Sequence, residues 1–216
     1  YLKEKAEEKG IIVLINGVVE NNTRRKLNVD EFRGFVLYDD IAPVIFINNN
    51  DAISAKIFTL IHEVVHILIG ESASFDLRNL QSADNKIEKF CDVCTAEFLV
   101  PSSELKTQYQ NTNNLEELAR YFKVSQIVIL RRLLDTQIIT QNKFYEQLND
   151  LYNQETKDEQ KSGGGNFYAI TSHRLSKRFL YILNSAVQNN IILYRDMLRV
   201  TGLKAKTCNE LIEGLL

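Results

Sequence analysis

The stretch IFTLIHEVVHILIG, at positions 57–70, sets two histidines and a glutamate among aliphatic residues. A helix over this stretch would be apolar nearly all round, and such helices are buried in the core of a protein. Burying an ionisable side chain costs free energy unless it is paired or holds a metal. The chain therefore needs a fold that surrounds one central helix and gives His62, Glu63 and His66 a role.

The spacing of these three residues indicates a metal site. Side chains at positions i and i+4 lie on one face of a helix, so His62 and His66 can direct imidazole nitrogens at one ion. Glu63 lies beside that face, within reach of a water molecule on the metal, where it can act as a base. This H-E-x-x-H pattern is typical of zinc peptidases. The alternative, two core histidines and a chance acid, leaves the glutamate without a reason.

A catalytic zinc takes three protein ligands and keeps one position open. The remaining histidine, His173, is remote in the sequence. The next predicted helix offers the acids Glu88, Asp92 and Glu97 instead. Glu88 and Asp92 are four residues apart, so one can bind the metal while the other supports a ligand imidazole. Glu97 would point in a partly reversed direction, so the pair is favoured over it.

The segments around this helix predict an α+β fold. Short apolar stretches rich in β-branched and aromatic residues come before it, with connections too short for most helical crossovers, so the sheet is expected to be small and antiparallel or mixed. A polar stretch separates the two predicted helices. The expected strands lie in 11–19, 31–40 and 44–47, and the expected helices over 52–69 and 86–99.

The strand Val44–Ile47 comes just before the H-E-x-x-H helix. An extended substrate could pair with a strand in this position by β-augmentation. Ile45, Ile47 and Asn48 are therefore the predicted substrate-binding residues.

The second half of the chain is predicted to be helical. LEELARYFKVSQIVILRRL, at 115–133, has the pattern of a helix-turn-helix in which Ser125 caps the second helix. That helix carries the apolar run 127–130, leaving Gln126, Arg131 and Arg132 as possible DNA contacts. Direct nucleic-acid binding by this unit is therefore not favoured over a packing or protein-recognition role.

Changes in composition divide the chain into four expected parts. These are a domain over 1–110, expected from its H-E-x-x-H pattern to be a zincin-like metallopeptidase domain, a helix-turn-helix-like unit over 111–152, a linker over 153–165 and a C-terminal helical segment over 166–216. The linker assignment rests on the polar and glycine-rich stretch NQETKDEQKSGGG.

Composition excludes several classes of protein. The 26 Lys and Arg against 28 Asp and Glu give a net charge of −2, without the basic excess of a typical nucleic-acid-binding protein. No apolar run approaches the roughly 20 residues that span a bilayer, and no signal peptide is recognised. Three cysteines are too few for a disulfide framework, so a cytoplasmic setting is expected. Cys91 and Cys94, flanked by Phe90, Val93 and Phe98, are predicted to be small core residues rather than a redox pair.

Three stretches resemble the ImmA/IrrE family of bacterial and phage metallopeptidases: APVIFINNND, FTLIHEVVHILIGES and IEKFCDVCTAEFLVP. The resemblance covers about Gly34–Pro101 and is looser beyond it. It implies a gluzincin-like site in which His62, His66 and Glu88 hold Zn²⁺ and Glu63 is the base. Asp92 stands where family members often carry Asn, and is expected to support a ligand imidazole. Mn²⁺ and Fe²⁺ also suit two histidines and a carboxylate.

The resemblance also implies a substrate: such peptidases cleave a helix-turn-helix repressor and thereby derepress mobile-element or stress genes. The alternative function is a non-catalytic zincin-like module or transcription regulator that grips a repressor or DNA. A structural metal site needs the histidines but has no use for an acid beside the open position, so Glu63 favours catalysis. The oligomeric state is not given by the sequence.

Overall fold

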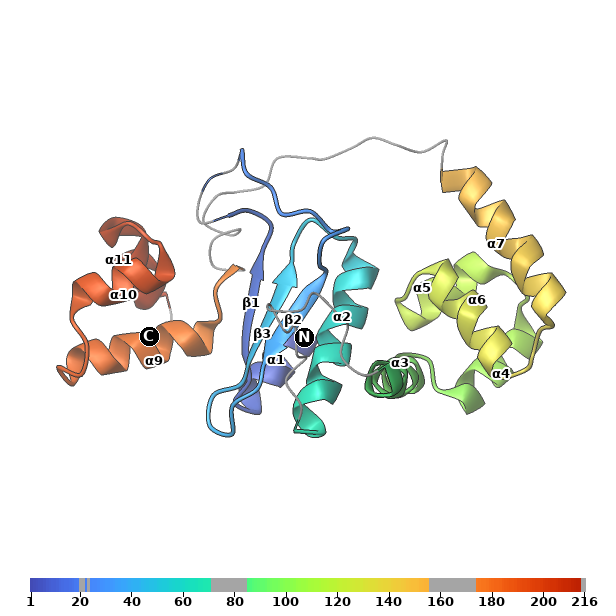
Figure 1. Cartoon of the computed structure of the whole chain (residues 1–216), viewed down its shortest axis with the longest axis horizontal. Helices are drawn as coiled ribbons and strands as arrows, with labels where there is room; N and C mark the ends of the chain where they lie inside the picture. Colours follow the sequence, from blue (N-terminus) through green and yellow to red (C-terminus); the bar gives the residue numbers. More distant parts are fainter. Residues whose placement is uncertain (20–21, 23, 71–84, 156–173, 215–216) are drawn as a thin grey trace. The chain divides into compact units, whose positions relative to one another are not determined.

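The structure is a computed structural model that describes residues 1–19, 22, 24–70, 85–155 and 174–214 (Figure 1). The predicted α+β fold is confirmed: a small sheet is combined with many helices. The strands are β1 (Ile12–Asn16), β2 (Gly34–Leu37) and β3 (Val44–Asn48). The helices are α1 (Leu2–Glu8), α2 (Ile53–Leu68), α3 (Asn85–Leu99), α4 (Ser102–Asn111), α5 (Leu115–Phe122), α6 (Gln126–Asp135), α7 (Gln141–Glu155), α9 (Lys177–Gln188), α10 (Tyr194–Thr201) and α11 (Ala205–Glu213).

The described residues fall into two compact units. One comprises residues 1–51, 66–70 and 174–214, and the other comprises 52–65 and 85–155. Helix α2 runs without a break through the boundary and contributes to both. No helix in the described ranges is long and apolar enough to cross a membrane.

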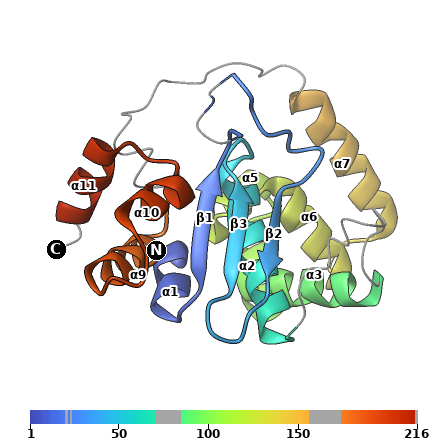
Figure 2. The same ribbon diagram turned by 60° about the vertical axis from the view of Figure 1, so that its left-hand side comes forward.

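The sheet is mixed, as expected, with the strand order β1-β3-β2 (Figure 2). β1 runs parallel to β3, and β2 runs antiparallel to it. Alternation of side chains buries one face of the sheet, which is formed by Val13, Ile15, Val36, Ile45 and Ile47. On the opposite face the rings of Phe35 and Phe46 stack with their centroids 5.2 Å apart.

The predicted role of β3 in substrate binding is wrong. β3 is the central strand and pairs on both sides, so no edge is left for an extended peptide. Ile45 and Ile47 are buried in the core. Asn48 is also buried. Its polar atoms are satisfied there, because its amide nitrogen donates to the carbonyl of Phe32 and its side-chain oxygen accepts from the backbone of Asn50. All three residues hold the sheet together.

Helices α4 to α7 share one hydrophobic core in the second unit. The fully buried side chains of this core include Val100, Leu105, Leu118, Ile129, Leu130 and Leu133. Leu105, on α4, belongs to this core although it precedes the domain boundary expected after residue 110. The helix α7 also continues to Glu155, into the expected linker, whose residues 156–165 lie outside the described ranges.

The predicted break between α5 and α6 is present. Lys123 ends α5 in the left-handed region, with φ 58°, and Ser125 caps α6 by accepting a hydrogen bond from the backbone of Val128. Asn114 caps α5 in the same manner, accepting from Glu116 and Glu117. Two capped helices joined by three residues form a helix-turn-helix-like pair.

Candidate metal centre

Helix α2 carries both histidines and the glutamate of the H-E-x-x-H pattern. Its many Leu, Ile and Val residues, spread over more than four turns, favour burial. The helix ends at Leu68, one residue before the predicted end at Ile69. His66 is 1% exposed and Glu63 is 6% exposed, while His62 is partly buried. The sequence therefore places three ionisable groups where they need partners.

Glu88 comes to His62 from α3, across 26 residues of sequence. Its Oε2 atom lies 3.1 Å from Nε2 of His62. One ligand atom each from His62, His66 and Glu88 all lie within 4.8 Å of one another. Zinc bonds of about 2.0–2.2 Å place neighbouring ligand atoms roughly 3–4 Å apart, so at its widest the cluster would close by about 1 Å around a single ion. Two imidazoles and a carboxylate also match the donor set of a catalytic zinc.

Asp92 approaches the other nitrogen of the same imidazole. Its Oδ1 atom is 3.1 Å from Nδ1 of His62. Burial by itself would lower the pKa of His62, but the hydrogen bond to Asp92 and the nearby carboxylates raise it above its usual value. Asp92 is therefore placed to orient the ring of His62 while Glu88 lies on the side of the candidate ion.

Glu63 has the electrostatics of a base. Burial raises the pKa of its carboxyl to about 7, against the lowering effect of His62. Within the described part of the chain, its Oε2 atom has no hydrogen-bond partner. A general base works best when its pKa lies near the working pH. The carboxyl of Glu63 thus has both the burial and the proton affinity for this role.

Glu97, the remaining acid considered from the sequence, is engaged elsewhere. Its Oε1 atom accepts from the backbone and the hydroxyl of Ser102, at 3.1 and 3.2 Å. Its other oxygen pairs with the guanidinium of Arg132. The side chain therefore joins α3 to the helices that follow, and it is absent from the cluster around His62.

The two cysteines of α3 differ in burial. Cys91 is fully buried, and burial raises the pKa of its thiol to about 11, so it is not a reactive thiolate. Cys94 is only partly buried. Cys91 is therefore the small core residue that the sequence predicts, although the flanking Phe90, Val93 and Phe98 are more than half exposed.

Two of the side chains considered as possible DNA contacts of α6 have protein partners in the structure. Arg132 is 7% exposed, and its Nε atom donates to the carbonyl of Val100 at 3.0 Å. Arg131 is exposed and pairs with Asp135 at 3.0 Å. His173, the third histidine, lies outside the described residues.

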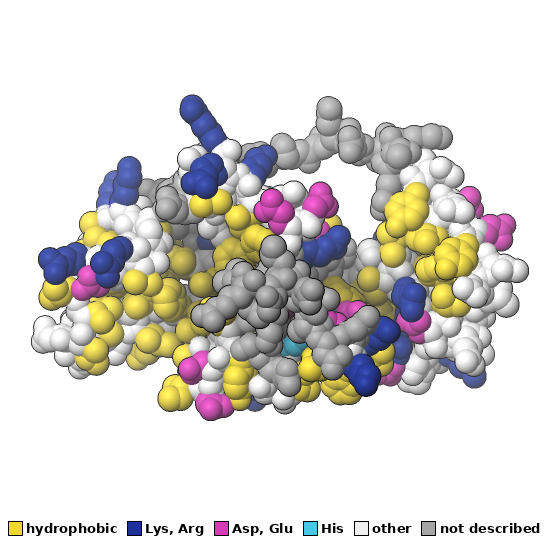
Figure 3. All heavy atoms as spheres, viewed as in Figure 1, with side chains coloured by type: hydrophobic (Ala, Val, Ile, Leu, Met, Phe, Trp, Pro, Cys, Tyr) yellow, Lys and Arg dark blue, Asp and Glu magenta, His cyan; other side chains and the backbone are white. Residues whose placement is uncertain are grey.

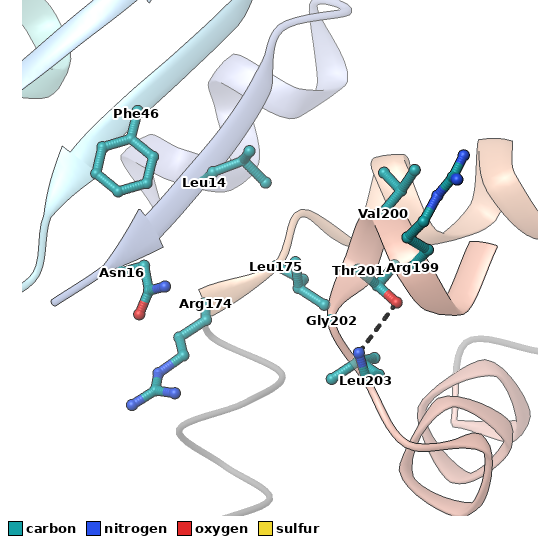
Figure 4. Close-up of a pocket in the computed structure, with 10 residues that line it drawn as sticks. All are labelled: Leu14, Asn16, Phe46, Arg174, Leu175, Arg199, Val200, Thr201, Gly202 and Leu203. Carbon is teal, nitrogen blue, oxygen red and sulfur yellow. Dashed lines mark hydrogen bonds between the residues drawn. The ribbon is translucent and has the colours of Figure 1, made fainter. Parts of the chain in front are cut away.

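A second feature, which was not predicted from the sequence, is a cavity of about 280 Å³ in the first unit (Figure 4). Leu14 and Phe46 of the sheet form one wall, and Leu175 and Leu203 approach from the C-terminal helices. Its lining comes from segments far apart in the chain, so no local pattern marks it.

Residues 6–134 match the family model described as the IrrE N-terminal-like domain, which is a model of a peptidase family. The match covers more than half of the chain and includes α2 and α3 with all the residues of the cluster. None of the curated proteins compared with the chain matches it.

Proposed function

The chain belongs to the IrrE N-terminal-like family of peptidases, and on this premise we propose that it is a cytoplasmic, zinc-dependent endopeptidase. Its substrate is a regulatory protein, a helix-turn-helix repressor, whose cleavage derepresses mobile-element or stress genes. The observation that carries the proposal is the cluster of His62, His66 and Glu88, with Glu63 beside it on the same helix. Family membership supports the peptidase activity, and the donor set supports zinc.

His62, His66 and Glu88 would hold the ion. When bound, zinc supplies Lewis-acid chemistry: it polarises a peptide carbonyl and makes water acidic near neutral pH. Glu63 takes the proton from the attacking water and gives it to the nitrogen of the leaving amine. Burial of this carboxyl favours its protonated form, which supports a role in accepting a proton.

Asp92 acts through His62. Its Oδ1 atom lies 3.1 Å from Nδ1, where a carboxylate would favour the ring orientation in which Nε2 faces Glu88. A carboxylate in this position also increases the basicity of the imidazole. Asp92 is therefore a positioning residue.

An extended substrate would pair with an outer edge of the sheet, since β3 is paired on both sides. Of the two outer strands described, β2 is less buried than β1, and its last residue, Leu37, is 58% exposed. We assign the substrate strand to β2 on that ground. Amide hydrogen exchange at Gly34–Leu37 should slow when a Glu63→Gln variant binds its substrate, and unchanged exchange would exclude this edge.

The test of the function compares wild type with Glu63→Gln. Both zinc-loaded proteins are incubated with helix-turn-helix repressors from the same genome, and new N-termini are identified by mass spectrometry. Removal of the general base should slow cleavage by about 10²–10⁴-fold while zinc is retained. Glu146→Gln is the control, because it removes an exposed acid of α7 that is not part of the cluster and should leave cleavage intact. Equal cleavage by Glu63→Gln would contradict the role of Glu63, and repression relieved without any cleavage would favour the non-catalytic binding module.

A further inference from the structure

The cavity of about 280 Å³ lies in the first unit, between one face of the sheet and the C-terminal helices (Figure 4). Its lining shares no residue with the metal cluster. The lining residues are Leu14, Asn16, Phe46, Arg174, Leu175, Arg199, Val200, Thr201, Gly202 and Leu203. Pockets for drug-sized ligands have about 300–1,000 Å³, so this volume suits a smaller molecule.

The sheet contributes a fixed apolar wall. Leu14 of β1 and Phe46 of β3 are register partners in the parallel pair, so both side chains lie on the same face of the sheet. The ring of Phe46 stacks on that of Phe35, with their centroids 5.2 Å apart, and this contact restricts the ring. A ligand on this side of the sheet would meet an apolar and partly aromatic surface.

The C-terminal segment contributes another wall, which is also held in place. Leu175 and Leu203 pack against the buried core that α9, α10 and α11 share. Lys3 of α1 donates to the carbonyl of Leu175 at 3.2 Å. Gly202 takes the left-handed conformation, with φ 65°, and the backbone nitrogen of Leu203 donates to the hydroxyl of Thr201. Both walls therefore have contacts of their own, so a ligand would not need to order them.

The cavity is open to solvent at the end of α10. Arg199 and Gly202 are exposed, and the side chain of Val200 is 58% exposed. Hydrophobic side chains are prominent on the surface of the C-terminal helices (Figure 3). Because exposed residues form part of the lining, a small molecule can enter on this side.

The charges of the lining are positive. The described residues that form it include Arg174 and Arg199 and contain no Asp or Glu. Arg199 is 81% exposed, pairs with Asp196 at 3.6 Å and points away from the cavity in Figure 4. The charge that a ligand in the cavity would meet is therefore that of Arg174.

Arg174 has a donor that needs an acceptor. Its Nε atom is shielded from solvent and has no hydrogen-bond partner within the described part of the chain. A guanidinium keeps its proton in proteins, and a shielded N–H without a partner costs free energy. Glu7 of α1, which interacts with Ser176, is already paired with Lys3 at 3.8 Å. An anion in the cavity would supply the missing acceptor.

We propose that this cavity binds a small organic anion, namely a carboxylate with a compact apolar body. The planar guanidinium of Arg174 presents parallel N–H donors that match the two oxygens of a carboxylate. The apolar body lies between Phe46 and Leu203, where its surface is removed from water. The bound ligand contacts both the sheet and the C-terminal helices. The site does not depend on the proposed peptidase activity.

The test is a titration of the full chain, with isotope-labelled Leu and Val methyl groups, followed by NMR. Phenylacetate is the aromatic probe and hexanoate is the aliphatic probe. Phenylacetamide has the shape of phenylacetate without its charge, and acetate has the charge without the apolar body. The methyl groups of Leu14, Val200 and Leu203 report on the cavity. Carboxylates also bind zinc, so Leu60 and Val65 of α2 report on the metal cluster.

Arg174→Gln is the variant that removes the proposed partner of the carboxylate. Arg195→Gln is the matched control, because it removes an exposed cation of α10 that does not line the cavity. Circular dichroism verifies that both variants fold. The comparison of phenylacetate with phenylacetamide uses wild type alone, so it tests the charge requirement even if Arg174→Gln does not fold.

At least one of the two larger carboxylates should shift the cavity methyl resonances saturably. For phenylacetate, loss of the charge in phenylacetamide, or of the cation in Arg174→Gln, should raise the dissociation constant about tenfold or more, because a hydrogen bond between charged groups is lost. Acetate should bind more weakly than the larger carboxylates, and Arg195→Gln should bind as wild type does.

Three results would overturn the proposal. The first is the absence of saturable shifts with both phenylacetate and hexanoate. The second is equal affinity of wild type for the larger carboxylates and for phenylacetamide or acetate, or an equal loss in Arg174→Gln and Arg195→Gln. The third is a set of shifts confined to Leu60 and Val65, which would place the carboxylate at the metal cluster.

Discussion

Nε2 of His62 lies 3.1 Å from Oε2 of Glu88, and Nδ1 of the same ring lies 3.1 Å from Oδ1 of Asp92. The two carboxylates are one helical turn apart on α3, so side chains of α3 contact both nitrogens of one imidazole. This arrangement separates the roles of the two acids. Glu88 shares its side of the ring with His66, whereas Asp92 lies on the far side.

Substitution of Asp92 should weaken zinc binding without abolishing it. Loss of a carboxylate that supports a ligand imidazole typically costs 10–100-fold in metal affinity. Asp92→Ala is therefore expected to raise the dissociation constant for zinc by about that factor in a competition titration with a chromophoric chelator. The exposed Glu146→Ala should leave it unchanged, and an equal loss in both variants would remove Asp92 from the site.

Arg132 should be more important for stability than its neighbour Arg131. Arg132→Leu leaves the carbonyl of Val100 without its donor, which costs about 1–3 kcal/mol in the free energy of unfolding. Arg131→Leu removes only an exposed pair with Asp135, worth about 0.3–0.5 kcal/mol. Urea denaturation of the two variants measures the difference, and equal values would contradict the buried contact.

The turns that follow α5 and α10 predict opposite effects of glycine substitutions. Lys123 has a left-handed backbone, which costs a residue with a Cβ atom about 1 kcal/mol, so Lys123→Gly should stabilise the protein. Gly202 has the same conformation, so Gly202→Ala should destabilise it by a similar amount. Thermal unfolding of both variants tests the pair, and a shift of the same sign in each would show that the turns differ.

The buried pair of α1 predicts a pH dependence. Glu7 is buried 3.8 Å from Lys3, and burial raises the pKa of Glu7 despite the lowering effect of Lys3. A raised folded-state pKa means that the contribution of Glu7 to stability is present below its unfolded value of 4.5 and is lost as pH rises. Glu7→Gln, which resembles the protonated form, should therefore gain stability relative to wild type between pH 4.5 and neutral pH. The exposed Glu8→Gln is the control, and a constant difference across this range would contradict the burial effect.

The sequence was sufficient to predict what depends on local pattern. The helix with His62 and His66, the cap at Ser125 and the break after Phe122 all follow from periodicity and capping preference over a few residues. The approach of Glu88 was predicted from donor chemistry and family resemblance together.

Features that depend on strand order and helix orientation could not be predicted. β3 follows β2 in the chain but lies between β1 and β2, and nothing in the apolar pattern of Ile45 and Ile47 distinguishes a central strand from an edge strand. The exposure of Phe90 and the burial of Arg132 have the same origin. Each depends on which face of its helix meets a neighbouring helix.

The central claim, that His62, His66 and Glu88 bind one zinc ion, is tested most directly by elemental analysis of the purified protein and its variants. Wild type and Glu63→Gln should each contain about one zinc per chain, since Glu63 is a base and not a ligand. His62→Ala and Glu88→Ala should contain almost none. Metal-free wild type under zinc-replete conditions, or full zinc content in Glu88→Ala, would contradict the account.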